Sequence, residues 1–395
     1  MTDSTAFEWQ RRQLLLAAGG IALVASPLVN AVALAPGRAS VPPRPIAPVR
    51  ASADRIIAID AALRPFRSNG PRIEAERLGR KVVVHNYGHG GSGWSLSWGA
   101  AAQALRLVQE TGSRELAVIG CGAIGLTSAL LAQRAGLQVC IYARERPPLV
   151  ASSFATGVWS PNSRLCAATQ ASPDFAMRWE SMARHAYRAH QDLLGLPGQP
   201  VQWRDSYTLT NNASGLPTPI ISDEPAYAQL DARLADLHPG SLLLPDDANP
   251  FPVRHARLGS ELIFNIGAYA RMLLEEYLLL GGELQPRSFS DSAELAELPQ
   301  QTLINATGYG ARTLFADSSV VPIRGQVARL IPQPEVDYGL NYDNAVFMLP
   351  RQDGLIIQSP SLGNFGNSDT RPDRASVLKA IDCLAGLFDS RNSTS

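Results

Sequence analysis

The stretch that decides the fold is ELAVIGCGAIG, residues 115–125. Its first five residues form a short, almost wholly apolar run, which is typical of a parallel strand buried on both faces. Gly120, Gly122 and Gly125 follow at once with the spacing of a dinucleotide-binding turn. Residues 126–135 then have helical character. This context predicts a strand, a glycine turn and a helix in direct succession.

Each position of this turn has a physical role. Gly120 allows the tight turn, Gly122 lets a pyrophosphate approach the backbone, and Gly125 lets the helix pack closely on the strand. Ala123 and Ile124 complete the turn and are assigned to the same site, because the N-terminus of the following helix supplies unpaired N–H groups and a positive dipole that favour a phosphate. The unit therefore predicts a dinucleotide site, and the turn by itself leaves both NAD and FAD open.

A second strand, QVCIY at residues 138–142, follows the helix. In the usual pattern an acidic residue at the end of this strand accepts hydrogen bonds from the adenosine ribose. Here the strand runs into Arg144 and Glu145, so Glu145 is the candidate and Arg144 lies beside it. The alternative is a surface ion pair between Glu145 and a neighbouring arginine.

The composition excludes several classes of protein. The chain has 395 residues, of which 45% are hydrophobic, and its 35 basic residues balance its 35 acidic residues. A chain of this length and apolar content predicts about two domains with a sizeable core. Zero net charge without a basic run argues against nucleic acid as a partner. None of the four cysteines belongs to a CxxC pair, so we expect neither a disulfide scaffold nor a metal site.

The N-terminal segment has the pattern of an export signal. Arg11 and Arg12 precede an apolar run that ends at Val29, and small side chains follow at residues 31–33. This pattern predicts a twin-arginine export signal over residues 1–33 and hence a periplasmic or secreted protein that meets the twin-arginine export machinery. The alternative, a membrane anchor, suits the run less well because glycine and proline interrupt it. The Pro-rich residues 34–53 are predicted to form an extended linker.

A second glycine-rich segment precedes the dinucleotide unit. Residues 81–84 are a strand candidate and run into HNYGHGGSGWSLSWGAA at 85–101, after which helical periodicity continues to about residue 110. Its glycines expose backbone N–H groups just ahead of a helix, so the loop can hold an anion or a developing negative charge. The residues assigned to this loop are Gly90, Gly91, Ser92, Gly93, Trp94 and Ser95.

Residues 83–101 resemble the signature of the D-amino-acid oxidase family, in which a hydrophobic pair, His, Asn, Tyr, Gly, a glycine run and a later Gly-x-Ala occur at fixed spacing. LRPFR at 63–67 resembles the family segment whose arginine pairs with the substrate carboxylate. The segment at 151–159 is similar to its flavin-approaching loop, and residues 304–308 and 324–326 to elements near the FAD. The resemblance extends from about residue 54 to residue 388.

The resemblance implies an α/β fold with a doubly wound, Rossmann-like FAD-binding domain and a second, mixed-sheet substrate domain. The FAD-binding parts would be residues 78–165 and 284–325, and the substrate domain residues 54–77, 166–283 and 326–388, within one unit over 54–395. It also implies FAD as cofactor and oxidative deamination of D-amino acids with oxygen, giving keto acids, ammonia and hydrogen peroxide. Further cofactor contacts implied are Ser152, Ser153, Gly157, Val158, Thr307 and Gly308.

The order of these motifs departs from the family. Its members begin with the dinucleotide strand and finish with the His-Asn-Tyr-Gly segment, whereas this chain places the closing segment first and joins it to the dinucleotide strand through residues 111–113. We interpret this order as a circular permutation, which is reasonable where the old termini lie close together. The alternative is two independent domains that share motifs.

The resemblance also suggests which residues touch the substrate. Arg64 is the candidate for the carboxylate because its planar fork binds a carboxylate bidentately, and the alternative is a structural salt bridge with Glu74 or Glu76. Gly91 belongs to the loop expected to stabilise the negative charge of a reduced flavin. The family's substrate-binding tyrosine is matched by Phe347, which has no hydroxyl, and Tyr342 lies nearby in the sequence.

The sequence leaves several alternatives open for the function and for individual residues. A hydride mechanism needs no general base, so His85 and His89 are expected to be hydrogen-bonding scaffold. The stretch at 358–361 lacks the paired glycines expected there, which affects the shape of the pocket. A glycine- or sarcosine-type amine oxidase of the same fold, a flavin-binding protein with weak catalysis and an NAD-dependent dehydrogenase are the alternatives. A homodimer is a further possibility.

Overall fold

The computed structural model describes residues 45–359 and 363–392. The predicted export signal and residues 34–44 of the predicted linker lie outside the described residues. The end of that linker is part of the folded unit, because Val49 is only 4% exposed and the hydroxyl of Tyr338 donates a 2.6 Å hydrogen bond to the carbonyl of Ala47. Among the described residues, no helix has both the length and the apolar character of a membrane span.

Two sheets organise these residues. The strands are β1 (Ile56–Phe66), β2 (Arg72–Leu78), β3 (Lys81–Tyr87), β4 (Glu115–Ile119), β5 (Gln138–Ala143), β6 (Val201–Thr210), β7 (Leu242–Leu243), β8 (His255–Phe264), β9 (Glu283–Pro286), β10 (Thr302–Asn305), β11 (Val321–Leu330), β12 (Tyr338–Tyr342), β13 (Val346–Arg351) and β14 (Gly354–Gln358). The helices are α1 (Gly93–Glu110), α2 (Ala123–Arg134), α3 (Pro173–Gln191), α4 (Ile266–Leu279), α5 (Ala311–Leu314) and α6 (Arg374–Asn392).

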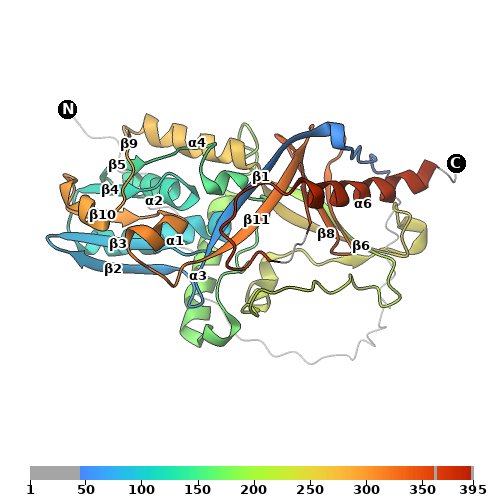
Figure 1. Ribbon diagram of the computed structural model, residues 1–395, viewed down its shortest axis with the longest axis horizontal. Helices are drawn as coiled ribbons and strands as arrows, with labels where there is room; N and C mark the ends of the chain where they lie inside the picture. The colour runs from blue at the N-terminus through green and yellow to red at the C-terminus, as the bar shows by residue number, and fades with distance from the viewer. Residues whose placement is uncertain (1–44, 360–362, 393–395) are drawn as a thin grey trace, which may run out of the picture. The chain divides into compact units, whose positions relative to one another are not determined.

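The first sheet has six strands in the order β2-β3-β10-β4-β5-β9. All neighbours pair in parallel except β2, which runs antiparallel to β3. Apolar residues of β3, β4 and β10 point to both faces, and both faces are covered, so these strands need no polar side. Helices α1 and α2 pack against one face (Figure 1), and the short α5 together with residues 292–298 covers the other.

The parallel pairing brings four strand ends to one edge of this sheet. The glycine loop follows β3, the dinucleotide turn follows β4, Arg144 follows β5, and Thr307 with Gly308 follows β10. In open α/β sheets, ligands bind outside the carboxyl ends of the strands. The doubly wound architecture predicted from the sequence is therefore present, and it gathers segments that lie more than 200 residues apart in the chain.

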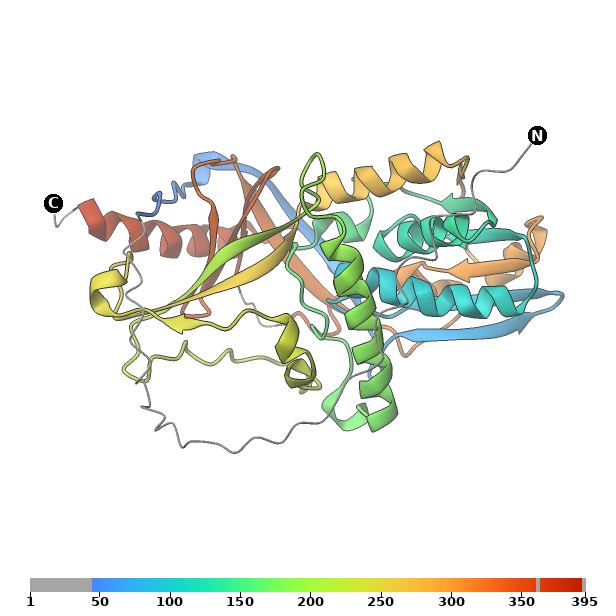
Figure 2. The same ribbon diagram turned by 180° about the vertical axis from the view of Figure 1, so that it is seen from behind.

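The second sheet has eight strands in the order β1-β11-β14-β13-β12-β6-β8-β7 and is antiparallel except for the β12–β6 pair. Helix α6 lies along one face of this sheet (Figure 2). On the other face Ile263 of β8 shares a buried cluster with Val327, Leu349 and Ile356. Because β8 is far from β11 in the strand order, this cluster requires the sheet to curl around its inner face.

Contacts from the first sheet reach this inner face. Residues 155–158 lead from the dinucleotide unit to the curled sheet, where the N–H of Phe264 donates a 2.7 Å hydrogen bond to the carbonyl of Gly157, and Val158 pairs with Ile263. Arg351, whose side chain is 3% exposed, donates from Nη1 to the carbonyl of Ala155 at 2.7 Å. The inner face of the eight-stranded sheet is therefore held beside the ligand-binding edge of the six-stranded sheet.

Candidate active site

The dinucleotide turn has the backbone geometry that its sequence predicts. Gly120 adopts a φ of +109°, and a Cβ atom at this position would lie 2.6 Å from the carbonyl oxygen of Ala306. A Cβ atom on Gly125 would lie 2.0 Å from the carbonyl oxygen of Gly120. Both distances are below any ordinary contact, so α2 approaches β4 closely only because these positions are glycine.

Ser152 joins three parts of the site. Its hydroxyl oxygen accepts a 3.1 Å hydrogen bond from the N–H of Ala123 in the first turn of α2, and its carbonyl accepts a 2.8 Å bond from the indole N–H of Trp94 in α1. A Cβ atom on Gly122 would lie 3.2 Å from the Ser152 hydroxyl. The predicted flavin-approaching loop thus packs directly on the N-terminal turns of α1 and α2. Ile124, also in the first turn of α2, packs partly buried against the adjoining core.

Directly after β5, Glu145 forms the surface ion pair with an arginine that is the alternative to a ribose contact. Its carboxylate lies 3.3 Å from the Nε atom of Arg144, and the two side chains are 42% and 73% exposed. Both residues follow directly after β5, at the ligand-binding edge. A contact of Glu145 with a ribose stays a prediction.

Two backbone N–H groups of the glycine loop after β3 are not free to bind a ligand, contrary to the expectation from the sequence. The N–H of Gly90 donates to the carbonyl of Pro65, and the N–H of Gly91 donates to the carbonyl of Ser163, both at 2.9 Å. A Cβ atom on Gly90 would lie only 1.8 Å from the carbonyl oxygen of Arg164, so the segment at 160–164 packs directly on the loop. The assignment of Gly90 and Gly91 as charge-stabilising donors is therefore wrong, because protein carbonyls already use both N–H groups.

The first turn of α1 offers donors in their place. The N–H of Leu96 bonds to the carbonyl of Ser92, which leaves Gly93, Trp94 and Ser95 as the residues whose N–H groups have no intrahelical acceptor. The Ser92 hydroxyl itself donates to the carbonyls of Ser160 and Ser163, so Ser92 holds the covering segment in place. Positive charge from the helix dipole adds to these free donors.

The residues at this edge fit a dinucleotide cofactor. The first turns of α1 and α2 both open there, and glycine backbone leaves room for close approach. The hydroxyl of Ser153 is buried without a hydrogen-bond partner in the described structure, as expected of a group that completes its bonding with a ligand. Thr307 and Gly308 follow β10 at the same edge, where the Thr307 hydroxyl donates to the Asn305 side chain at 2.7 Å and Gly308 has a φ of +59°.

Arg64 lies on the inner face of the eight-stranded sheet, close to this edge. Its Nη1 atom donates a 3.0 Å hydrogen bond to the carbonyl of Arg324, and a Cβ atom on Gly325 would lie 2.3 Å from the guanidinium. The guanidinium can lie flat on β11 only because residue 325 is glycine. No carboxylate of the described residues forms an ion pair with Arg64; Glu74 and Glu76 both bind Arg72 instead. The structural salt bridge considered for Arg64 is therefore wrong.

Burial lowers the pKa of Arg64 to about 10. The charge of Arg164 acts in the same direction, whereas Glu224 and Tyr227 oppose it. A cation that is partly withdrawn from water without a carboxylate partner is disfavoured, and an anionic ligand would relieve this cost.

Arg164, Glu224 and Tyr227 form a polar cluster beside Arg64 that the sequence did not reveal. Arg164 holds Glu224 bidentately, with Nε to Oε2 at 2.7 Å and Nη2 to Oε1 at 3.1 Å. The Tyr227 hydroxyl donates to Glu224 at 2.8 Å, and its ring meets Phe66 edge to face at 5.4 Å. These residues lie far from any glycine motif, and no local spacing marks them.

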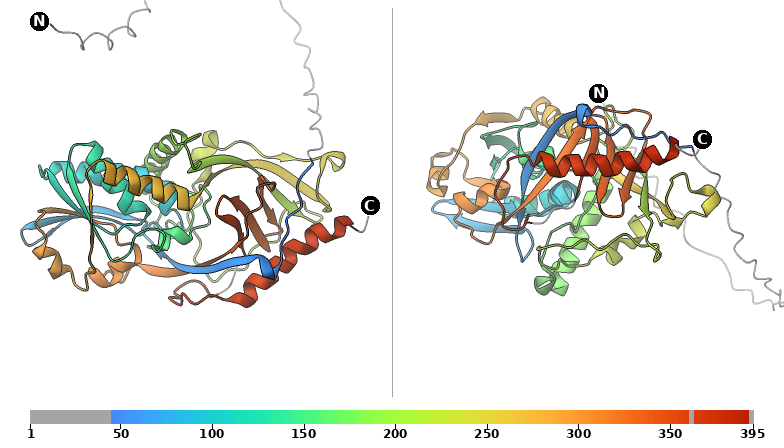
Figure 3. Two further views of the ribbon diagram at one scale, coloured as in Figure 1. Left: turned by 90° about the horizontal axis from the view of Figure 1, so that it is seen from above. Right: turned by 45° about the vertical axis from the view of Figure 1, so that its right-hand side comes forward.

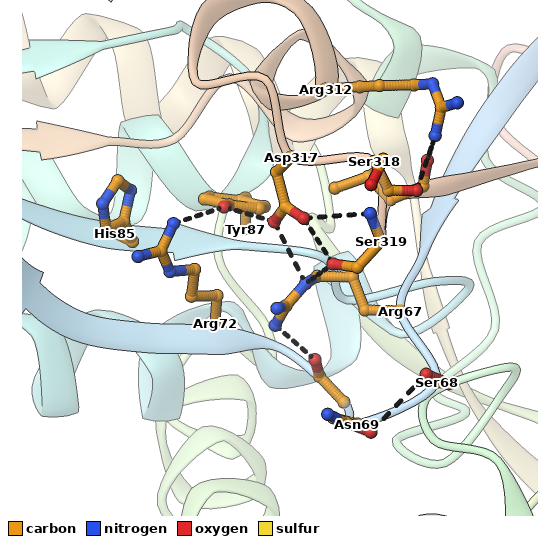
Figure 4. A network of polar contacts seen from close by, with 12 residues as sticks. Arg67, Ser68, Asn69, Arg72, His85, Tyr87, Arg312, Asp317, Ser318 and Ser319 are labelled. Carbon is orange, nitrogen blue, oxygen red and sulfur yellow. Dashed lines mark hydrogen bonds and ion pairs between the residues drawn. The ribbon is translucent and has the colours of Figure 1, made fainter.

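A polar network fixes the chain just beyond Arg64 (Figure 4). The hydroxyl of Tyr87 at the end of β3 donates to Asp317 at 2.7 Å, and Nε of Arg67 lies 3.3 Å from the same carboxylate. Arg72 donates to the Tyr87 hydroxyl at 3.2 Å. A Cβ atom on Gly88 would lie 2.6 Å from the Arg67 side chain. The network therefore ties the end of β1, which carries Arg64, to the start of the glycine loop.

His85 has partners that suit a structural role, whereas the Nε2 atom of His89 is buried without a hydrogen-bond partner among the described residues. The Nδ1 atom of His85 accepts from the side-chain amide of Asn305 at 3.2 Å, so its Nε2–H donates to Glu76 at 3.0 Å. His89 is buried, and burial lowers its pKa to about 3, so it is neutral near pH 7. The contacts of His85 suit a scaffold, and the scaffold role of His89 stays a prediction.

Phe347 and Tyr342 lie on opposite faces of the eight-stranded sheet. Phe347 packs with Val158 and Val327 on the inner face. Tyr342 pairs in register with Val346, the neighbour of Phe347, so strand alternation turns its side chain to the other face. Its hydroxyl accepts a 3.4 Å hydrogen bond from Asn211. The structure therefore does not bring Tyr342 to the face that carries Arg64 and Phe347.

No group of His, Cys, Asp and Glu side chains in the described part of the chain could hold a metal ion. The described cysteines are free; Cys121, Cys140 and Cys166 are buried and Cys383 is partly so. The arrangement offers a cofactor edge formed by two helix N-termini and, near it, the partly buried Arg64 guanidinium, which suits a carboxylate.

Comparisons with known proteins find similarity to FAD-dependent oxidoreductases. The sequence model of a family described as "FAD dependent oxidoreductase" (DAO) matches residues 115–394. The D-amino-acid oxidase of Dictyostelium discoideum is 24% identical over 279 residues, which are 69% of this chain and 73% of that protein. The D-amino-acid oxidase of Streptomyces coelicolor is 25% identical over 269 residues, 67% of this chain and 75% of that protein.

Solved structures that match part of this chain include glycine oxidase from Geobacillus kaustophilus, with a TM-score of 0.47 and 14% identity over 71% of this chain and 80% of that chain. Iminodiacetate oxidase from Chelativorans sp. BNC1 has a TM-score of 0.49 and 16% identity over 69% of this chain and 79% of that chain.

Proposed function

The chain belongs to the family of FAD-dependent oxidoreductases, whose sequence model spans residues 115–394, and on that premise we propose that it oxidises D-amino acids. FAD is its cofactor, and the NAD-dependent alternative is wrong. The proposed reaction converts the amino acid to an imino acid, which water hydrolyses to a keto acid and ammonia, while oxygen is reduced to hydrogen peroxide. D-amino-acid oxidases among its relatives support this choice of substrate.

The observation that carries the proposal is the state of Arg64. Its guanidinium is partly buried on the inner face, lies flat on Gly325 and lacks a carboxylate partner among the described residues. An α-amino acid supplies that carboxylate, and a bidentate pair fixes the face that its α-carbon presents. Binding and orientation are what a cofactor enzyme's protein must contribute.

Other residues hold the reacting groups in place. FAD, when bound, supplies the chemistry of accepting a hydride from the α-carbon. The free N–H groups of Gly93, Trp94 and Ser95 and the positive end of α1 favour negative charge at the edge they face. Arg351 holds residues 155–156, which precede Val158, against the curled sheet. No side chain is required to act as a base.

The chain order fits a circular permutation of the family's usual order. In the six-stranded sheet β3 lies next to β10, whereas in the chain β3 comes before β4. The short turn at 111–113 joins α1 directly to β4. Helix α6 lies close to the start of β1 (Figure 3), which is where the usual chain would continue. We further propose that residues 1–33 direct export to the periplasm; they lie outside the described residues.

The test is a panel of substrates on the purified holoenzyme. Peroxide release would be measured with D- and L-amino acids, glycine and sarcosine. We expect turnover of D-amino acids and little with their L-enantiomers. Turnover confined to glycine and sarcosine would replace the proposal with an amine oxidase of that type. A protein that holds FAD and oxidises none of these would contradict it.

A further inference from the structure

We propose that Gln358 is a second substrate-contacting residue, whose side-chain amide donates a hydrogen bond to the carboxylate held by Arg64. This inference rests on the proposed function and adds to it the donor that Phe347 cannot provide. Four observations carry it: the face on which Gln358 lies, the orientation of its amide, the position of β14 in the sheet, and the apolar character of its neighbours.

Gln358 lies on the inner face of the eight-stranded sheet. It is the last residue of β14 and pairs in register with Phe347, so the two side chains share a face. Phe347 packs against Val158 and Val327 in the inner cluster. The flanking residues Ile357 and Ser359 line a cleft beneath α6, on the other side of the sheet. The side chain of Gln358 is therefore directed toward the face that also carries Arg64.

The amide of Gln358 is held in one orientation. The hydroxyl of Thr156 donates a 2.8 Å hydrogen bond to its Oε1 atom. Thr156 is itself fixed, because its carbonyl accepts from Arg351 in the segment that leads to Val158. With the oxygen engaged, the Nε2 group faces away from Thr156, and no described residue accepts a hydrogen bond from it. Two N–H donors are thus available on the inner face.

The strand order places these donors between Arg64 and Phe347. Arg64 rests its guanidinium on Gly325 of β11, β14 is the next strand, and β13 with Phe347 follows. The β11–β14 register, in which Ala328 pairs with Ile357, puts Gln358 beside Val327, two residues along β11 from Gly325. Adjacent strands lie about 4.8 Å apart and two residues span about 7 Å, so a carboxylate bound in front of the guanidinium would bridge this offset. A carboxylate has about four lone-pair sites, of which a bidentate arginine uses two.

The neighbours leave Gln358 as the donor for the remaining lone pairs. Val327, Ile356 and Phe347 share the inner face around it and carry no polar atoms in their side chains. A carboxylate placed among them would keep unpaired oxygen lone pairs, and burial makes an unpaired lone pair costly. A neutral amide satisfies one of these lone pairs without adding a charge that would compete with Arg64.

The experiment measures carboxylate binding to the holoenzyme, independently of turnover. Benzoate would be titrated into the purified protein while the flavin absorbance is followed. The variants are Gln358→Met, which keeps the length and removes the donors, and Gln358→Glu, which puts a negative charge beside Arg64. Gln352→Met is the matched control, because this exposed glutamine lies in the β13–β14 turn of the same hairpin. FAD content and the melting temperature report folding.

We expect Gln358→Met to weaken benzoate binding and to raise KM for the amino acid by about ten- to hundredfold, with kcat changed much less. Gln358→Glu should weaken binding further, and Gln352→Met should match the wild type. Thr156→Val, which releases the amide, should weaken binding a few-fold. If Gln358→Met does not fold, Gln358→Asn tests the same point, because its shorter side chain keeps the amide from reaching the carboxylate.

Two results separate the failure of this inference from that of the proposed function. Benzoate binding within twofold of the wild type in folded Gln358→Met, with binding lost in Arg64→Met, overturns the role of Gln358 and leaves the oxidase intact. A wild-type protein that holds FAD and binds neither benzoate nor amino acids overturns both proposals.

Discussion

At the scale of single residues, Arg64 is the group that keeps hydrogen-bond donors free for a ligand carboxylate. A guanidinium placed on Gly325, with one carbonyl as its partner, keeps most of its donors for a ligand. The neighbouring Arg164 is neutralised by Glu224, so it adds little net charge. The substrate carboxylate would therefore complete a charge balance that the folded chain leaves open at one residue.

Arg64→Met tests this balance. Removing one partner of a buried charge pair costs about 2–5 kcal/mol, so kcat/KM for the amino acid should fall by roughly thirty- to several-thousandfold. FAD should stay bound, because Arg64 belongs to the curled sheet and not to the turns at α1 or α2. Peroxide release and the flavin spectrum measure the two effects. Loss of FAD together with activity would show that Arg64 is structural.

His89 predicts a dependence of stability on pH. Its pKa is lowered to about 3 by burial, whereas in the unfolded chain it takes up a proton near the ordinary value of about 6.5. The unfolded chain thus binds more protons between these values, and the stability due to neutral His89 is present above about pH 6.5 and lost as the pH falls toward 3.

The contribution of His89 is limited to about 1.4 kcal/mol per pH unit. Urea unfolding at about pH 7 and about pH 5 should show a shallower pH dependence in His89→Leu than in the wild type. Equal slopes in the wild type and His89→Leu would mean that His89 takes up its proton at the same pH in the folded and the unfolded chain.

At the scale of elements, close packing between helix and strand decides the cofactor edge. Helix α2 passes β4 at a distance that only Gly125 permits, and Gly120 makes the turn with a φ of +109°. The glycine loop after β3 serves a related purpose, because its glycines admit the carbonyls of residues 163 and 164. Absence of a side chain is therefore used here for packing as much as for ligand approach.

Gly125→Ala tests the packing of α2. The new methyl group would lie 2.0 Å from the carbonyl oxygen of Gly120, so α2 must shift away from β4. Overpacking of this kind costs about 1–3 kcal/mol, and the shift should also reduce FAD content. The flavin absorbance per protein and the melting temperature measure both.

The matched control for Gly125→Ala is Gly386→Ala. Gly386 lies in α6, and no heavy atom is within 4 Å of a Cβ atom placed there. Alanine in a helix interior is about 1 kcal/mol more favourable than glycine, so this variant should be slightly more stable. Normal FAD content in Gly125→Ala would contradict the close approach of α2 to β4.

At the scale of the whole molecule, the connection between elements is separable from their packing. Strand β3 lies beside β10 and α1 lies beside α2, although the chain reaches β3 and α1 first. The views in Figures 1, 2 and 3 agree that the start of β1 lies close to α6. Under the proposed permutation, the folded contacts would not depend on where the chain is cut, provided that the cut falls at the surface.

A recut chain tests the permutation. Joining the end of α6 to the start of β1 with a flexible linker of about ten residues, and opening the chain at Gly112, restores the order usual in the family. This protein should bind FAD and melt within a few degrees of the wild type. Opening the chain at Gly308 instead, at the cofactor edge, should abolish FAD binding. Failure of the Gly112 form to fold, with the linker lengthened as well, would contradict the permutation.

Motifs whose chemistry is local were predictable from the sequence. The strand, the glycine turn and α2 were expected from one contiguous stretch, because apolar periodicity and glycine spacing express backbone geometry directly. Arg64 was expected from its resemblance to a family segment. The donors of the glycine loop were assigned wrongly, because the sequence does not show that Ser163 and Arg164 fold over Gly90 and Gly91.

The sequence by itself determined the backbone of the cofactor edge: two glycine turns, the helices that follow them and the buried strands between. Only the tertiary structure decided what faces that edge. It brought Glu224 and Tyr227 to Arg64, turned Tyr342 away from Phe347 and set Gln358 between Arg64 and Phe347. The reason is physical: glycine spacing acts through neighbouring residues, whereas side chains from distant strands meet only when register and sheet curvature have been set.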